Sequence, residues 1–103
     1  MKGVIKANAA ERIEGIHKLS EKYNRATGKD HADRLLEMIG KHSVEIKELH
    51  DKKDKHSLIE TGDLIILCFE YLLENGASID DVIAKCFERF ETKIKFVSSE
   101  KIM

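Results

Sequence analysis

One segment, Leu64 to Leu73, constrains the fold of this chain more than any other. Nine of its ten residues are apolar or aromatic, so on a helix they would surround nearly the whole circumference, and such a helix must be enclosed on every side. The chain contains no proline, the residue that most strongly breaks helices, and Asn75-Gly76 is a common pair at a helix C-terminus. We therefore predict a helix from about Ser57 to Glu74 that needs neighbours on all its faces.

Apolar residues recur at helical spacing in three further stretches of the chain. The length of 103 residues fits one small domain, so we predict a single all-α domain over residues 1–103. Asp51 to His56 is fully polar and is predicted to be a loop, and Ser98 to Met103 a frayed tail. The three other helices are predicted over about Asn8 to Tyr23, Asp30 to His50 and Ser78 to Phe96.

Four short helices offer too little apolar surface to enclose the helix that ends at Glu74. A second copy of the chain would supply the missing surface, so we expect a homo-oligomer, at least a dimer, with this helix at the interface. The alternative is that the aliphatic stems of Lys and Arg from neighbouring helices cover it.

The overall charge excludes some partners. Eighteen basic residues balance nineteen acidic ones, which gives no steering toward nucleic acid or an anionic membrane. The longest apolar run, Leu64 to Phe69, is far too short to span a bilayer, and the N-terminus lacks the apolar stretch of a signal peptide. Cys68 and Cys86 lie among apolar residues and are expected to be buried, reduced thiols, although a disulfide between them is an alternative. We expect a cytoplasmic protein.

Two pairs of acidic residues carry the most suggestive spacing. On a helix, residues three apart project from one face, so each pair forms a two-carboxylate patch. The pairs lie on consecutive predicted helices, and the interval between them allows an antiparallel return that makes the patches face each other. Converging carboxylates repel one another, and a hard cation such as Mg²⁺ or Mn²⁺ relieves that repulsion. The four residues are Glu45, Glu48, Glu60 and Asp63.

A solvated helix face explains the same spacing without a metal. Each glutamate of the first pair has a lysine four residues away, Lys41 or Lys52, with which it can form an ion pair. Ser57 precedes Glu60 by three residues, which is a capping-box pattern.

Asp63 and Gly62 favour the metal site. Asp63 opens directly onto the apolar run, where an unpaired carboxylate is costly and needs a partner. Gly62 lies within a helix, where glycine costs about 1 kcal/mol relative to alanine. We expect another helix or a ligand to approach the backbone there.

The acidic motifs carry a resemblance to a known family. Glu45-Ile-Lys-Glu48 followed by Glu60-Thr-Gly-Asp63 resembles the Glu-x-x-Glu and Glu-x-x-Asp signature of the all-α nucleotide pyrophosphohydrolases. That superfamily includes MazG, the dimeric dUTPases, the dCTP pyrophosphatases and phosphoribosyl-ATP pyrophosphohydrolase.

The resemblance extends to the C-terminal part of the chain. Asn75 to Val82 is similar to the family's turn into its last helix, and Arg89 to Lys93 resembles the basic ending of that helix. In all, the likeness covers about residues 35–95.

The resemblance implies a MazG-like four-helix bundle assembled as a homodimer or homotetramer. It implies that Mg²⁺, or Mn²⁺, binds the acidic quartet, which is catalytic, and that a nucleoside triphosphate is hydrolysed between its α and β phosphates to a nucleoside monophosphate and pyrophosphate. Arg89 and Lys93, four residues apart on one helix face, would bind phosphates in the same chain or in its partner.

Two alternatives remain open. The same site could act on phosphoribosyl-ATP, or the chain could be a helical dimerisation module without catalysis. A di-iron bundle needs two Glu-x-x-His motifs, and only Glu14-x-x-His17 fits. His42 and His50 flank the first acid pair and are expected to be surface or hydrogen-bonded residues.

Overall fold

Four helices make up the computed structural model, which describes the backbone of residues 2–102 and the side chains of residue 9 and residues 11–98. The described residues contain no strand, which confirms the predicted all-α class. In chain order the helices are α1 (Lys2–Ala26), α2 (His31–Asp51), α3 (His56–Glu74) and α4 (Ile79–Ile102).

The connections lie where the sequence predicts them, because local chemistry fixes each one. Gly28 and Gly76 follow α1 and α3 with φ of +74° and +69°, a left-handed conformation that glycine adopts without steric cost. Asp30 caps α2, and its side chain accepts a hydrogen bond of 2.9 Å from the backbone N–H of Asp33. Each break in the helical chain is therefore specified within a few residues.

Two predicted boundaries are wrong. Helix α1 begins at Lys2 rather than near Asn8, and α4 continues to Ile102, so the tail predicted to fray from Ser98 is helical as far as that residue. Neither segment contains proline, so nothing in it breaks a helix.

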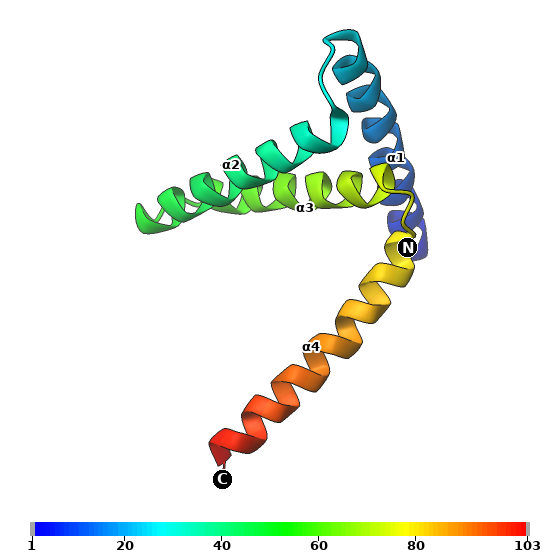
Figure 1. Cartoon of the computed structure of the whole chain (residues 1–103). Helices are drawn as coiled ribbons and strands as arrows, with labels where there is room; N and C mark the ends of the chain where they lie inside the picture. Colours follow the sequence, from blue (N-terminus) through cyan, green and yellow to red (C-terminus); the bar gives the residue numbers. More distant parts are fainter. Residues whose placement is uncertain (1, 103) are drawn as a thin grey trace.

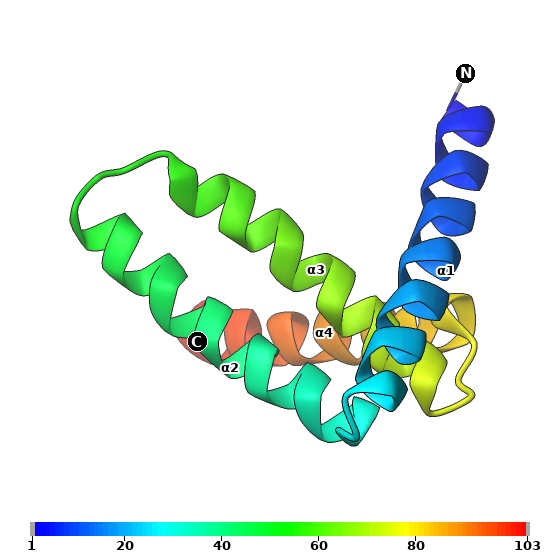
Figure 2. The same cartoon turned by 90° about the horizontal axis from the view of Figure 1, so that it is seen from above.

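Helices α2 and α3 form an antiparallel hairpin joined by a tight turn, and they run side by side in both views (Figures 1 and 2). The chain reverses through Lys53, which adopts a left-handed conformation with φ of 58°. Asp54 stabilises the turn, because its carboxylate accepts a hydrogen bond of 2.9 Å from the N–H of His56. Helix α1 crosses the open end of the hairpin (Figure 2). Among the described residues, the buried apolar side chains are those of Leu35 on α2 and Leu67 on α3.

Helix α4 diverges from the other three helices (Figure 1), and within the described part of the chain the helix it contacts is α3. The radius of gyration is 16.8 Å, whereas a compact domain of this length has about 13 Å. The accessible surface is 8468 Å², against roughly 5,900 Å² for a compact monomer of this mass. Apolar side chains account for part of the excess, since five on α4 are between 48% and 65% exposed: Phe87, Phe90, Ile94, Phe96 and Val97.

The apolar helix α3 is only partly enclosed by its own chain. Leu67 is buried, but Ile65 is half exposed and Leu58 is 70% exposed. Both cysteines are free, and Cys68 is exposed rather than buried as expected. Partial burial nevertheless raises the pKa of the Cys68 thiol. No helix in the described part of the chain is long and apolar enough to cross a membrane.

Candidate metal centre

The hairpin brings part of the predicted acid site together. Ligand atoms of His42 on α2 and of Glu60 and Asp63 on α3 all lie within 4.8 Å of one another. Glu60 and Asp63 share one helix face because they are three residues apart, and His42 faces them across the hairpin. Glu60 and Asp63 therefore lie together, and the side chain that faces them from α2 is His42 rather than the first acid pair.

Glu60 is the least exposed member of this group. Its side chain is 16% exposed and lies between two histidines, with Oε2 3.3 Å from His42 Nε2 and Oε1 3.4 Å from His56 Nε2. Oε2 is buried and has no hydrogen-bond partner. A buried carboxylate oxygen without a partner loses its hydration without compensation, so this atom favours a bound cation or a protonated histidine.

The orientation of His42 leaves its Nε2 atom available to bind a metal ion. His42 Nδ1 lies 2.9 Å from the backbone carbonyl of Met38, and a carbonyl can only accept, so Nδ1 carries the hydrogen. Nε2, which faces Glu60, then holds either a lone pair or a second proton. A histidine that donates one ring N–H to a backbone carbonyl and presents the other nitrogen is the arrangement found in metal ligands.

The structure corrects the reasoning about Asp63 and Gly62. Asp63 is exposed, so solvent already stabilises its charge, and the buried carboxylate at this site belongs to Glu60. A Cβ added to Gly62 would meet nothing within 4 Å. Within one chain no helix approaches the backbone there, and the space beside Gly62 is open.

The first acid pair lies on α2 beside this group. Glu45 and Glu48 are exposed, and neither belongs to a group of three metal-binding side chains among the described residues. Glu45 follows His42 by three residues and therefore projects from the same face of α2. Glu45 thus lies on the side of α2 that carries His42, but neither Glu45 nor Glu48 is part of the His42 group in the single chain.

The exposure of Glu45, Glu48 and Asp63 is what a solvated helix face gives, but the ion pairs and the cap expected with that alternative are not formed. No ion pair joins Glu45 to Lys41 or Glu48 to Lys52 in the part of the chain that the structure describes. The capping box predicted at Ser57 is also absent from α3.

That helix begins at His56, and Lys55 is its N-cap residue, without a side-chain hydrogen bond. Ser57 instead lies within the first turn, where its carbonyl accepts a hydrogen bond of 2.7 Å from the Thr61 hydroxyl.

A surface hollow of about 370 Å³ adjoins the group. Asp63 and His42 lie at one end of it, and Glu70, two helical turns further along α3, lies at the other. The hollow is within the size range of small-molecule sites. Its remaining walls are mostly apolar and come from α1, α2 and α3: Ile16, Ser20, Met38, Ile66 and Leu67.

The basic residues predicted to bind phosphate lie on α4. Arg89 and Lys93 are exposed, four residues apart, and together with Glu88 and Thr92 line one shallow surface. Neither has an ion pair within the described residues. Both cations belong to α4, which diverges from the hairpin (Figure 1).

His42 is the member of the group that sequence reasoning missed. It precedes Glu45 by three residues, so the i, i+3 rule that paired the acids would have placed it on the same face. Comparison of the chain with protein families, curated proteins and solved structures found no match. The family resemblance therefore rests on the motifs alone.

Proposed function

We propose that this protein is a Mg²⁺-dependent nucleoside triphosphate pyrophosphohydrolase of the MazG-like type. The observation that carries the proposal is the half-buried Glu60, whose Oε2 has no hydrogen-bond partner and lies within ligand distance of Asp63 and His42. Two of the four motif carboxylates thus lie together on α3, and Glu45 follows His42 by one helical turn on α2.

The donor set fits a hard divalent cation. Glu60 and Asp63 offer carboxylate oxygens, and Glu45 and Glu48 add two more on the neighbouring helix. Mg²⁺ prefers such oxygens and retains several waters, which suits carboxylates that are still exposed. When bound, Mg²⁺ would neutralise phosphate charge and lower the pKa of an attacking water.

The chain's own residues would orient the substrate. The hollow beside Asp63 and His42 has mostly apolar walls and is of a size to receive a nucleoside, which would leave the triphosphate at the acid cluster. In the reaction, water adds to the α phosphorus and the bond from that phosphorus to the bridging oxygen breaks. Pyrophosphate leaves, and the nucleoside monophosphate remains.

The active form would be a homo-oligomer. Helix α4 exposes Phe87, Phe90 and Ile94, and α3 exposes Ile65 and Cys68. The accessible surface exceeds that of a compact monomer by about 2,500 Å², enough for a large subunit interface. A second copy packed on α3 and α4 would cover these side chains, and Arg89 and Lys93 would then reach phosphates in the partner.

Pyrophosphate release tests the proposal. The untagged chain is incubated with Mg²⁺ and a panel of canonical, deoxy and modified nucleoside triphosphates and phosphoribosyl-ATP, and pyrophosphate and monophosphate are quantified. Hydrolysis in ¹⁸O-labelled water is expected to place the label in the monophosphate. As a control, Glu37→Gln removes the charge of an exposed α2 glutamate that lies outside the His42 group, and it should leave the rate of hydrolysis unchanged.

The outcomes separate the alternatives. If phosphoribosyl-ATP alone is hydrolysed, it is the substrate in place of a nucleoside triphosphate, and the proposed metal site stands. If no compound yields pyrophosphate and Mg²⁺ does not raise the melting temperature, the proposed enzyme activity is refuted. The helical dimerisation module is then the remaining alternative.

A further inference from the structure

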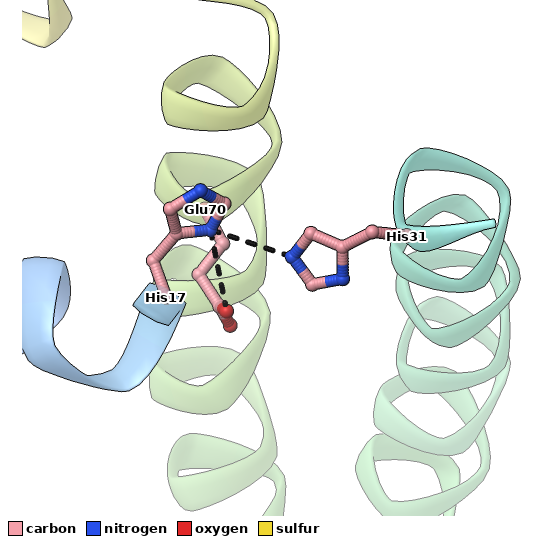
Figure 3. Close-up of side chains that lie close together, drawn as sticks. All are labelled: His17, His31 and Glu70. Carbon is pink, nitrogen blue, oxygen red and sulfur yellow. Dashed lines mark hydrogen bonds and ion pairs between the residues drawn. The ribbon is translucent and has the colours of Figure 1, made fainter. Parts of the chain in front are cut away.

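A second cluster of metal-binding side chains lies at the crossing of the first three helices (Figure 3). His17 comes from α1, His31 from the first residue of α2 and Glu70 from α3, and their ligand atoms all lie within 4.8 Å of one another. Glu70 is 2% exposed and His31 6%. We propose that this cluster is a zinc site that fastens α1 to the α2–α3 hairpin.

The carboxylate of Glu70 is the observation that points to a ligand. Its Oε1 is buried and has no hydrogen-bond partner, which is costly for a charged group. The nearest nitrogen is His17 Nδ1 at 3.9 Å, which is too far for a hydrogen bond. The arrangement therefore leaves a gap between the histidines and the carboxylate that direct contact does not close.

The separations suit a metal in that gap. His31 Nε2 lies 3.4 Å from His17 Nδ1, and His17 Nδ1 lies 3.9 Å from Glu70 Oε1. Ligands about 2.0–2.1 Å from a tetrahedral zinc ion lie about 3.3 Å from each other. The third separation, between His31 and Glu70, is below 4.8 Å, so the carboxylate would move toward both rings when three bonds to one ion form.

Asn24 supplies the outer support that zinc-bound histidines require. Its buried side-chain amide nitrogen, Nδ2, lies 2.6 Å from His31 Nδ1. The amide oxygen and nitrogen exchange places when the side chain flips by 180°, and in the flipped orientation His31 Nδ1–H donates to the Asn24 oxygen while Nε2 presents its lone pair toward His17 and Glu70. Ligating histidines almost always donate their second N–H in this way, and loss of such a partner lowers metal affinity 10- to 100-fold.

The donor set selects the metal. Two imidazole nitrogens and one carboxylate form a common zinc site with a fourth position for water or another ligand, whereas Mg²⁺ favours oxygen. Glu21 and Glu74 form a second group with His17 and are the next oxygen donors along α1 and α3. Their charges also help to balance the dication.

A structural role follows from the small core. The chain buries two apolar side chains, Leu35 and Leu67, among its described residues, and small domains with so little core commonly rely on disulfides or metals. Both cysteines are free. One ion bound by three helices would therefore hold α1 in place, independently of the proposed hydrolase activity.

Zinc stoichiometry and affinity test the site. The untagged protein is loaded with Zn²⁺ and freed of excess, bound metal is counted by mass spectrometry, and Kd is measured by competition with a chromophoric chelator. We expect zinc to be lost, or Kd raised at least 100-fold, in Glu70→Gln and in His31→Gln. Asn24→Ala should raise Kd by about 10- to 100-fold. Circular dichroism confirms that each variant is helical.

Three controls keep the proposal falsifiable. His50→Gln changes an exposed histidine of α2, and His42→Gln and Glu60→Gln alter the other cluster; all three should keep the high-affinity zinc. Saturating Zn²⁺ should also raise the melting temperature of the wild type by on the order of 10 °C and not that of Glu70→Gln. Absence of bound zinc, or zinc that survives in Glu70→Gln and disappears in His42→Gln, would overturn the proposal.

Discussion

Glu60 and Glu70 lie ten residues apart on α3, about 15 Å along the helix, and each has one buried carboxylate oxygen without a hydrogen-bond partner. Their neighbours differ. Both glutamates lie beside two histidines, but Glu60 is partly open to solvent and its group adds the exposed carboxylate of Asp63, whereas Glu70 is buried and the other two members of its group are both histidines. One helix thus presents an open, oxygen-rich cluster and a closed, nitrogen-rich one.

This contrast shows that exposure and donor type together determine what a carboxylate can do. An open site lets a hydrated cation keep its waters and leaves room for a phosphate chain. A closed site with imidazole ligands favours zinc and a fixed geometry. The comparison therefore separates a proposed catalytic end of α3 from a proposed structural end.

The largest expected effect is at the open cluster. Glu60→Gln should lower pyrophosphate release by about 10²- to 10³-fold, because it removes the charge of the carboxylate nearest to both histidines. Initial rates with saturating Mg²⁺ and the best triphosphate of the panel measure the loss. Activity equal to wild type would show that this carboxylate has no part in catalysis.

The second effect concerns assembly. Phe90→Glu places a charge on the exposed apolar side of α4 and should raise the dissociation constant of the oligomer by at least about tenfold. Sedimentation equilibrium measures it. Thr92→Glu adds the same charge at an exposed polar position of α4 and should assemble normally; equal effects of the two variants would place the interface elsewhere.

The cap of α2 provides a smaller effect that reports on the closed cluster. Asp30→Ala removes the hydrogen bond to the N–H of Asp33 and should lower the free energy of unfolding by about 1 kcal/mol. Asp30 directly precedes His31, so bound zinc should restore part of the loss. Melting curves with and without Zn²⁺ test this, and Asp30→Asn, which keeps an acceptor, should remain near wild type.

The smallest expected effect is at Gly62, where a substitution tests whether a ligand or a partner subunit approaches the open cluster. Gly62→Ala and Gly40→Ala each replace an exposed helical glycine with open space around it, so each should stabilise the chain by about 1 kcal/mol. If a nucleotide or a partner subunit approaches Gly62, only Gly62→Ala should also reduce turnover. Equal turnover in the two variants would mean that nothing approaches that backbone.

Local features of the fold were predictable because they depend on neighbouring residues. The turns at Gly28 and Gly76 and the cap at Ser78, whose hydroxyl accepts a hydrogen bond of 3.3 Å from the N–H of Asp81, follow from short motifs. The pairing of Glu60 with Asp63 follows from helical spacing. The exposure of each side chain does not follow from helical spacing. For this reason Asp63 was expected to be the costly carboxylate, although Glu60 is the half-buried one.

The closed cluster was beyond sequence reasoning for a physical reason. His17, His31 and Glu70 are separated by 14 residues and more, and only the crossing of α1 over the hairpin joins them. Periodicity assigns a residue to a helix face but does not say which faces meet. Glu14-x-x-His17 is a match within one helix, whereas the neighbours of His17 in the cluster lie on α2 and α3.

A paired metal titration tests the separation of the two clusters most directly. Binding of Mg²⁺ and of Zn²⁺ to Glu60→Gln and Glu70→Gln is measured by isothermal titration calorimetry under identical conditions. The account predicts that Glu60→Gln loses Mg²⁺ binding and keeps one high-affinity zinc ion, and that Glu70→Gln loses this zinc and keeps Mg²⁺. Loss of both ions in either folded variant, or no binding of either ion to the wild type, would contradict it.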